Sequence, residues 1–204
     1  MNMKTFMIIG VVLSGFITIV APSLVANPQA EVIKSMTTVS HTSTAKDLVV
    51  TRTFDAPVDE LWKSWTDSEQ VQKWWGPKGF TAPVAKMDFR EGGTTLVCMR
   101  APKEFGGHDM YNTWTYKKIV PLQRIEFILN FADKDGNKLD PAKMGLPPGI
   151  PQDVPHVVTF QTVGDNKTEM TVTEHGYTTD QAVDLSRSGL EECLDKMAAA
   201  LAKH

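Results

Sequence analysis

The chain has 204 residues, of which 42% are hydrophobic and 22% are charged. This composition fits one globular domain with a real core, and it excludes collagen, a disulfide scaffold and long disordered tails. The 21 Lys and Arg residues stand against 24 Asp and Glu residues, so the formal net charge is -3. Because no basic surplus is left to neutralise a phosphate backbone, nucleic acid is not an expected partner.

The first 26 residues have the pattern of a secretory signal peptide. A positive start ending at Lys4 precedes an apolar run over 6–20, and small residues and prolines follow. This order predicts cleavage after Ala26 and a periplasmic or secreted protein with no stable membrane insertion after cleavage. The alternative is an uncleaved N-terminal anchor, although the apolar run is shorter than the roughly 20 residues that a membrane span needs.

A single folded domain is predicted to follow a flexible leader. The leader, over 27–46, is polar and rich in Ser and Thr, and the domain covers 47–204. The domain starts with an alternating run over 48–54 that is rich in β-branched residues, which predicts a strand.

Two short helices and a set of strands are predicted next. Pro57 suits the first turn of one helix, and Asp67 or Ser68 caps a second helix that ends at Trp75. Six period-two runs follow, separated by Gly, Pro, Asn and Asp, so an antiparallel sheet of about six or seven strands is expected. These runs cover 84–89, 94–100, 110–120, 124–132, 156–163 and 168–174.

The last element is predicted to be a long amphipathic helix capped by Thr179 or Asp180. Only the sheet offers enough apolar surface to bury its stripe, which predicts an α+β fold with a curved antiparallel sheet wrapped round the C-terminal helix. A space between helix and sheet suits a small molecule. The Pro-rich segment over 139–154 is predicted to form a lid over one end of the sheet. The stripe consists of Leu190, Leu194, Met197 and Leu201.

No pattern typical of a metal, cofactor or nucleophile site occurs. The sequence lacks Cys-x-x-Cys, His-Glu-x-x-His, a phosphate-binding glycine loop and Gly-x-Ser-x-Gly, so no metal and no cofactor are expected. The segment over 133–136 has its glycine too early for a calcium loop and is interpreted as a turn. If Val97 and Met99 face the terminal helix, Cys98 points away from it and cannot reach Cys193, which predicts two free thiols.

Four short motifs mark the ends of predicted elements. They are Phe54-Asp55-Ala56-Pro57, Trp74-Trp75-Gly76-Pro77, Asp88-Phe89-Arg90-Glu91-Gly92-Gly93 and Glu174-His175-Gly176-Tyr177. With these motifs, the chain over 48–201 resembles the SRPBCC, or START-like, superfamily, in the branch named for activators of the heat-shock-protein-90 ATPase. The resemblance implies the helix-grip fold with a cavity between the terminal helix and the sheet. It implies less about activity, because members include lipid carriers, hormone receptors, aromatases and cyclases.

The chain departs from this branch in two respects. The branch often has a Trp after the glycine of the terminal helix, whereas Leu190 follows Gly189 here, which predicts a larger cavity. The branch name suggests a co-chaperone. However, the predicted export separates the chain from a cytosolic chaperone and its ATP, so such a partner is not expected.

The expected ligand is a small hydrophobic or aromatic molecule. Trp114 and Tyr116 share one strand face with Met110 and Asn112, and they form either core or the floor of the cavity, where Tyr116 would orient a ligand. The predicted ligand-binding residues are Trp75, Phe80, Met99, Trp114, Tyr116, Phe127, His156, Phe160, Leu190 and Leu194.

Two other hydrophobic groups are interpreted as structural. Trp74 and Trp75 are adjacent, so on a helix they point about 100° apart. We interpret them as wedges that hold the short helices against the sheet. A second group shares one strand face and is interpreted as plain core: Ile125, Phe127, Leu129 and Phe131.

Two registers are open for the last hairpin. A three-residue loop over 164–166 places His156 opposite Glu174, whereas a two-residue turn places His156 opposite His175. Apolar pairs on the buried face favour the first register. A His opposite a Glu at a pocket mouth is either an oriented base that also suits a polar ligand head, or a structural ion pair that anchors the lid. The second register adds only a weak metal hypothesis.

Three functions are compatible with these residues. The first is an exported binder of a small, mainly hydrophobic ligand. The second is a cyclase- or hydratase-type enzyme that uses His156, Glu174 and Tyr116 to handle protons. The third is a protein-interaction or chaperone-like module of the cell envelope.

Overall fold

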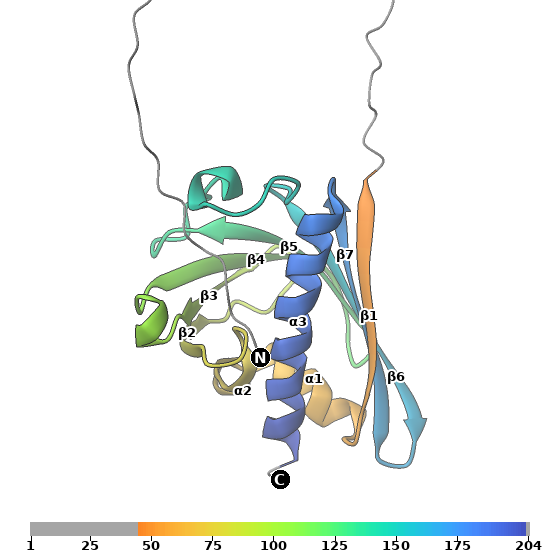
Figure 1. Cartoon of the computed structure of the whole chain (residues 1–204). Coiled ribbons are helices and arrows are strands. Elements are labelled where there is room, and N and C mark those ends of the chain that lie inside the picture. The colour runs from red at the N-terminus through yellow and green to blue at the C-terminus, as the bar shows by residue number, and fades with distance from the viewer. Residues whose placement is uncertain (1–44, 203–204) are drawn as a thin grey trace, which may run out of the picture. The chain divides into compact units, whose positions relative to one another are not determined.

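The computed structural model describes residues 45–202, so the predicted signal peptide over 1–26 and nearly all of the predicted leader over 27–46 lie outside the described residues. The described part contains one seven-stranded sheet and three α-helices (Figure 1). The strands are β1 (Lys46–Phe54), β2 (Thr81–Lys86), β3 (Thr94–Arg100), β4 (Asp109–Val120), β5 (Arg124–Ala132), β6 (Val154–Gly164) and β7 (Lys167–Tyr177), and the helices are α1 (Val58–Thr66), α2 (Ser68–Trp74) and α3 (Asp180–Leu201).

The sheet is antiparallel throughout, with the order β1-β7-β6-β5-β4-β3-β2. Figure 1 shows α3 lying across the curved sheet, with α1 and α2 near the C-terminal half of α3. β7 lies between the edge strand β1 and β6, and α3 follows β7 and lies over the concave face of the sheet. The predicted α+β fold, with a curved antiparallel sheet round the C-terminal helix, is confirmed.

Side-chain caps start two of the helices where the sequence predicts. The Asp67 carboxylate accepts a hydrogen bond from the Gln70 backbone N–H at 3.0 Å and begins α2. The Thr179 hydroxyl accepts one from the Ala182 backbone N–H at 3.2 Å and begins α3. Such caps satisfy backbone donors that have no partner inside the first helical turn. The first helix begins after Pro57, whose fixed φ suits that place.

Strand β2 begins three residues earlier than the sequence predicts and ends at Lys86 instead of Phe89. Pro83 lies inside this strand, which is tolerated because β2 is an edge strand with only β3 as its neighbour. The chain after Lys86 turns at Gly93, where a Cβ atom would lie 2.2 Å from the Asp88 carbonyl oxygen. Glycine is therefore required at this turn.

The last hairpin has the first of the two predicted registers, with His156 opposite Glu174, Val158 opposite Val172 and Phe160 opposite Met170. However, its connection is a two-residue turn at 165–166 and not the predicted three-residue loop. The pairing register of β6 with β7 also shifts by one residue, between Thr162 and Gly164, which forms a bulge. The extra residue of this bulge restores the alternation that the turn alone would have inverted.

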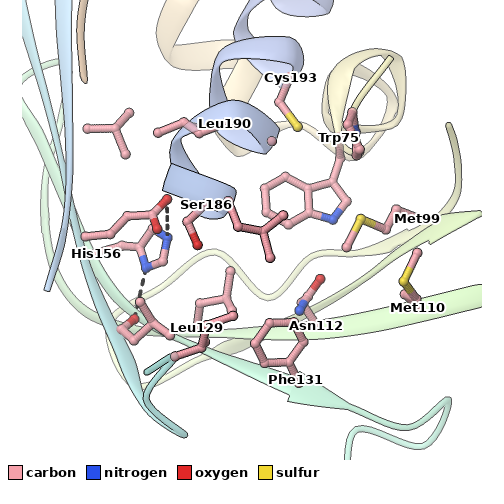
Figure 2. A pocket seen from close by; sticks show the side chains of 18 of the residues that line it. Trp75, Met99, Met110, Asn112, Leu129, Phe131, His156, Ser186, Leu190 and Cys193 are labelled. Atoms are coloured by element: carbon pink, nitrogen blue, oxygen red, sulfur yellow. Dashed lines mark hydrogen bonds and ion pairs between the residues drawn. The ribbon is translucent and has the colours of Figure 1, made fainter. Parts of the chain in front are cut away.

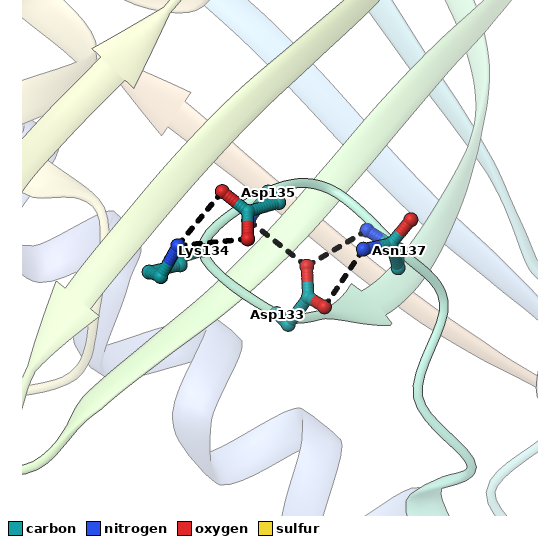
Figure 3. A network of polar contacts seen from close by, with 4 residues as sticks. All are labelled: Asp133, Lys134, Asp135 and Asn137. Carbon is teal, nitrogen blue, oxygen red and sulfur yellow. Dashed lines mark hydrogen bonds and ion pairs between the residues drawn. The ribbon is translucent and has the colours of Figure 1, made fainter.

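The segment over 133–136 forms the predicted turn (Figure 3). The Asp133 carboxylate accepts hydrogen bonds from the backbone N–H groups of Asp135 and Asn137, each at 2.9 Å, and from the Asn137 side chain. These bonds, led by the one from the Asn137 side chain, lower the pKa of Asp133. In the described part of the chain, no group of three or more His, Cys, Asp or Glu side chains is arranged to hold a metal ion.

Candidate functional site: a cavity between α3 and the sheet

A cavity of about 350 Å³ lies between α3 and the concave face of the sheet. Its walls come from α3, from strands β3 to β7, from Trp65 of α1, from the loop after α2 and from the segment that precedes β6. The volume falls within the roughly 300–1,000 Å³ of small-molecule sites. Most of the lining side chains are hydrophobic, which suits a mainly apolar occupant.

One side of the cavity carries a buried cluster of His156, Glu174 and Tyr177. Figure 2 labels His156 at this side. His156 Nδ1 lies 2.9 Å from the Val154 carbonyl oxygen, and Nε2 lies 3.3 Å from Glu174 Oε1. The Tyr177 hydroxyl donates a hydrogen bond to Glu174 Oε2. Strand pairing brings His156 and Glu174 together, because they are direct partners on β6 and β7.

Tyr177 reaches this cluster through a bulge. Strict alternation along β7 would place Glu174 and Tyr177, three residues apart, on opposite faces. Gly176 has a φ of +95°, and the β1–β7 register shifts between Lys46 and Leu48. The bulge returns Tyr177 to the buried face, so both side chains point to the cavity.

The protons of the cluster can be assigned from its contacts. A carbonyl oxygen only accepts, so His156 Nδ1 carries a proton. Burial by itself would raise the pKa of the Glu174 carboxyl, but the facing His156 and the hydrogen bonds from His156 and Tyr177 hold it below its usual value. Burial and the Glu174 charge raise the pKa of the Tyr177 hydroxyl, which therefore stays protonated as the donor. The cluster thus satisfies its own polar atoms.

The other side of the cavity carries Trp75 and Asn112, and Figure 2 shows both side chains at the cavity wall, away from His156. The buried atoms Trp75 Nε1 and Asn112 Oδ1 have no hydrogen-bond partner among the described residues. Lys196 of α3 holds the loop that carries Trp75. Its ammonium group donates to the carbonyl oxygens of Trp75, Gly76 and Phe80 at 3.4, 2.8 and 2.9 Å.

The Pro-rich segment predicted as a lid supplies Leu146 and Ile150 to the cavity wall. It is tied to the start of α3, where the Thr179 hydroxyl donates to the Pro148 carbonyl oxygen at 2.8 Å. Leu185, on the first turns of α3, also lines the cavity and is 47% exposed, which places it at the rim.

Six of the ten predicted ligand-binding residues line this cavity, and Glu174 lines it too. The six are Trp75, Phe80, Met99, Phe127, His156 and Leu190. Among the residues interpreted as structural, Trp75, Phe127, Leu129 and Phe131 also line it, whereas Trp74 and Ile125 are buried elsewhere in the core.

The other four, Trp114, Tyr116, Phe160 and Leu194, lie in the packed core and do not line the cavity. The short helices explain two of these positions, because their aromatic side chains cover that part of the sheet. The Trp114 ring lies 5.9 Å from that of Trp65, and the Phe160 ring lies 5.4 Å from that of Trp62.

Tyr116, a candidate for proton handling, is buried in the core and does not line the cavity. Its hydroxyl lies 2.9 Å from the Thr95 hydroxyl, and burial raises its pKa to about 12. The cavity hydroxyl next to the His156–Glu174 pair belongs instead to Tyr177. Sequence reasoning also missed Asn112 and Met110 as lining residues, although it placed them on the correct strand face. In the sequence, the glycine of the Glu174–Tyr177 motif was the feature that could have indicated the bulge that turns Tyr177 towards the cavity.

The two cysteines are free, as predicted. Met99 lines the cavity and Cys98 is its neighbour on β3, so Cys98 is directed to the opposite face of the sheet. Cys193 lines the cavity, and burial raises the pKa of its thiol to about 12. Both are therefore poor nucleophiles at neutral pH.

A curved antiparallel sheet that encloses a cavity against a long C-terminal helix defines the helix-grip class of proteins. Residues 55–202 match the family described as Activator of Hsp90 ATPase homolog 1-like protein. This match covers most of the chain, so the chain belongs to that family, within the SRPBCC superfamily.

Solved structures agree with this assignment. Protein Ms6760 from Mycobacterium smegmatis is 26% identical, with a TM-score of 0.59 over 76% of this chain and 87% of that chain. A protein from Arthrobacter aurescens is 23% identical, with a TM-score of 0.63 over 78% and 87% of the two chains. The AHSA1 protein from Silicibacter pomeroyi is 20% identical, with a TM-score of 0.62 over 78% and 100%. The last two support the fold alone.

A search of curated proteins gave no match. Among the helices of the described residues, none has the length and apolar character needed to span a membrane.

Proposed function

We propose that the chain binds a small, mainly hydrophobic molecule in the cavity between α3 and the sheet. The observation that carries this proposal is a cavity of about 350 Å³ whose walls are mostly apolar side chains from every strand between β3 and β7. A folded core fills such a space unless something occupies it, because packing is otherwise dense. The exposed Leu185 and the Leu146–Ile150 segment at the rim suit the passage of an apolar molecule.

The test is saturable binding of N-phenyl-1-naphthylamine, a neutral dye whose fluorescence rises in apolar surroundings. Leu190→Trp fills the cavity from α3 and is expected to reduce the dye's affinity at least tenfold. Glu191→Trp adds the same ring to the exposed neighbouring position and should leave binding unchanged. Absence of saturable binding to the wild type, or equal binding by Leu190→Trp, would refute the proposal.

We further propose that the protein works after export, as the N-terminal pattern predicts. A protein purified from the cell envelope should then have the mass of a chain that starts at Asn27. A mass that includes Met1 would refute cleavage after Ala26.

A second function, proton transfer on a bound ligand, is supported by one observation. His156 and Glu174 are buried side by side on the cavity wall, at 3.3 Å. Enzymes of the cyclase or hydratase type would use such a pair as acid and base. The test is exchange of the α-hydrogens of 2-tetralone for deuterium, followed by NMR. Catalysed exchange that His156→Ala abolishes supports this function, and exchange at the uncatalysed rate removes it.

A further inference from the structure

Two polar groups on the cavity wall have no partner among the described residues. Asn112 is 2% exposed, and its Oδ1 atom is buried without a hydrogen bond. The Nε1 atom of Trp75, on the same side of the cavity, is also buried without a hydrogen-bond partner among the described residues (Figure 2). A buried polar atom without a partner is unfavourable, so each such atom calls for an explanation.

Neighbouring tryptophans show that the chain can satisfy an indole N–H. Trp74 Nε1 donates to the Ser64 carbonyl oxygen at 2.7 Å, and Trp65 Nε1 donates to Met170 Sδ at 3.2 Å. Trp114 Nε1 also lacks a partner among the described residues, but Trp114 does not line the cavity. A molecule bound in the cavity can therefore supply a hydrogen-bond partner to Trp75 and Asn112, but not to Trp114.

Both groups are held in place. Asn112 is in the middle of the β4 ladder, opposite Val97 and Phe131. Trp75 belongs to the loop that Lys196 fixes through three carbonyl oxygens. A ligand group would thus meet an indole donor and an amide that are already positioned, which is how binding sites obtain specificity from few polar contacts.

The charges around the cavity select against an anion. No Lys or Arg side chain of the described residues lines it, and the Lys196 ammonium group is engaged with backbone carbonyls. The carboxylate that lines the cavity, Glu174, would repel a second negative charge. An ionised head group placed here would lose its hydration without compensation. A neutral polar group, in contrast, can both accept from Trp75 and pair with the Asn112 amide.

We propose that the ligand of this cavity is a neutral amphiphile, whose hydroxyl or amide group binds between Trp75 Nε1 and the Asn112 side chain. This inference rests on the proposed function and specifies its ligand class. The apolar part of the molecule extends past Leu129 and Leu190 towards the His156–Glu174 side. The polar head is thereby assigned to the side opposite the titratable pair.

The test compares naphthalene, 2-naphthol and 2-naphthoate by calorimetry on the wild type. Two hydrogen bonds to buried groups predict that 2-naphthol binds about tenfold more tightly than naphthalene. The anion 2-naphthoate should bind more weakly than either. In Asn112→Leu and Trp75→Phe, the preference for 2-naphthol over naphthalene should fall to about threefold or less, while naphthalene still binds. Trp62→Phe removes an indole outside the cavity and should keep the preference.

A spectroscopic readout separates a hydrogen bond from simple contact. In two-dimensional NMR of ¹⁵N-labelled protein, 2-naphthol should move the Trp75 indole N–H resonance downfield relative to naphthalene, whose ring currents are similar. The Trp114 indole resonance is the internal control and should not show this difference.

The outcomes distinguish the two proposals. If no naphthalene compound binds, the proposed function fails. If all bind with equal affinity, or if 2-naphthoate binds best, the proposed function stands and the neutral head group is refuted. If the preference for 2-naphthol survives in both Asn112→Leu and Trp75→Phe, the assignment to these two residues is refuted.

Discussion

The two polar sides of the cavity differ in how their hydrogen bonds are satisfied. His156, Glu174 and Tyr177 bond to one another and to the Val154 carbonyl oxygen, so this side is complete in the protein alone. Trp75 and Asn112 present buried polar atoms without partners among the described residues. The titratable pair is thus satisfied within the protein, whereas the uncharged side carries the polar atoms to which we assign a ligand. Four predictions test this difference.

The largest effect is expected from Glu174→Ala. Removal of the carboxylate leaves the buried His156 and Tyr177 without their partner, which should lower the free energy of unfolding by about 3–5 kcal/mol. Urea unfolding measures this loss. The triple variant His156→Leu, Glu174→Leu, Tyr177→Phe removes every member of the cluster together and should recover most of it. A loss below about 1 kcal/mol would contradict a structural cluster.

The cluster should also make stability depend on pH. The pKa of Glu174 is lowered in the folded protein from an ordinary value of 4.5. The ionised side chain therefore contributes stability above that value, and the contribution is lost as pH falls through the lower folded pKa. Relative to the triple variant, which lacks this carboxylate, the wild type should lose stability as pH falls below 4.5. A difference that stays constant on acidification would show that Glu174 is not ionised in the cluster.

A smaller effect of opposite sign is expected on the other side. Asn112→Leu removes a buried amide whose Oδ1 atom has no partner among the described residues, and should raise the stability of the ligand-free protein by about 1–2 kcal/mol. Asn130 on β5 is the matched control, since it is also 2% exposed but donates to the Gln152 carbonyl oxygen and to Asp153, each at 2.6 Å. Asn130→Leu should be destabilising by about 1–3 kcal/mol. An equal loss of stability in Asn112→Leu and Asn130→Leu would contradict the difference proposed between the two asparagines.

The smallest effect is expected from Gly189→Ala, which tests the open space between the two polar sides of the cavity. Gly189 lies inside α3 and lines the cavity, and a Cβ atom there would meet nothing within 4 Å. Gly189→Ala should therefore raise stability by about 0.5–1 kcal/mol through helix propensity, as measured by thermal unfolding. Gly93→Ala is the contrasting variant and should be destabilising, because its Cβ would collide with the Asp88 carbonyl oxygen. A destabilised Gly189→Ala would mean that the space is not open.

Much of the fold follows from local patterns. Alternation and caps located most of the strands and the helices, and the apolar pairs identified the partner of His156. The strand at 81–86 begins three residues before the predicted run, because an edge strand tolerates Pro83. The predicted loop length was also wrong, since a bulge between Thr162 and Gly164 supplies the residue that the turn lacks.

The site was less predictable. Alternation along a strand shows which face of the sheet a side chain is on, but it does not show whether a helix packs over that side chain. Met110, Asn112, Trp114 and Tyr116 share one face of β4, yet only the first two line the cavity. The rest of this face is packed beneath aromatic side chains, among them Trp65 of α1.

The sequence by itself determined most of the elements and their order, carried the resemblance to the family, and favoured the opposition of His156 to Glu174, because these depend on residues close in the chain or on direct strand pairing. Only the tertiary structure decided which part of the concave face stays open. It also decided that Tyr177 completes the cluster and that Asn112 and Trp75 remain without partners. Those outcomes depend on how helices and strands far apart in the sequence pack together, which local periodicity does not encode.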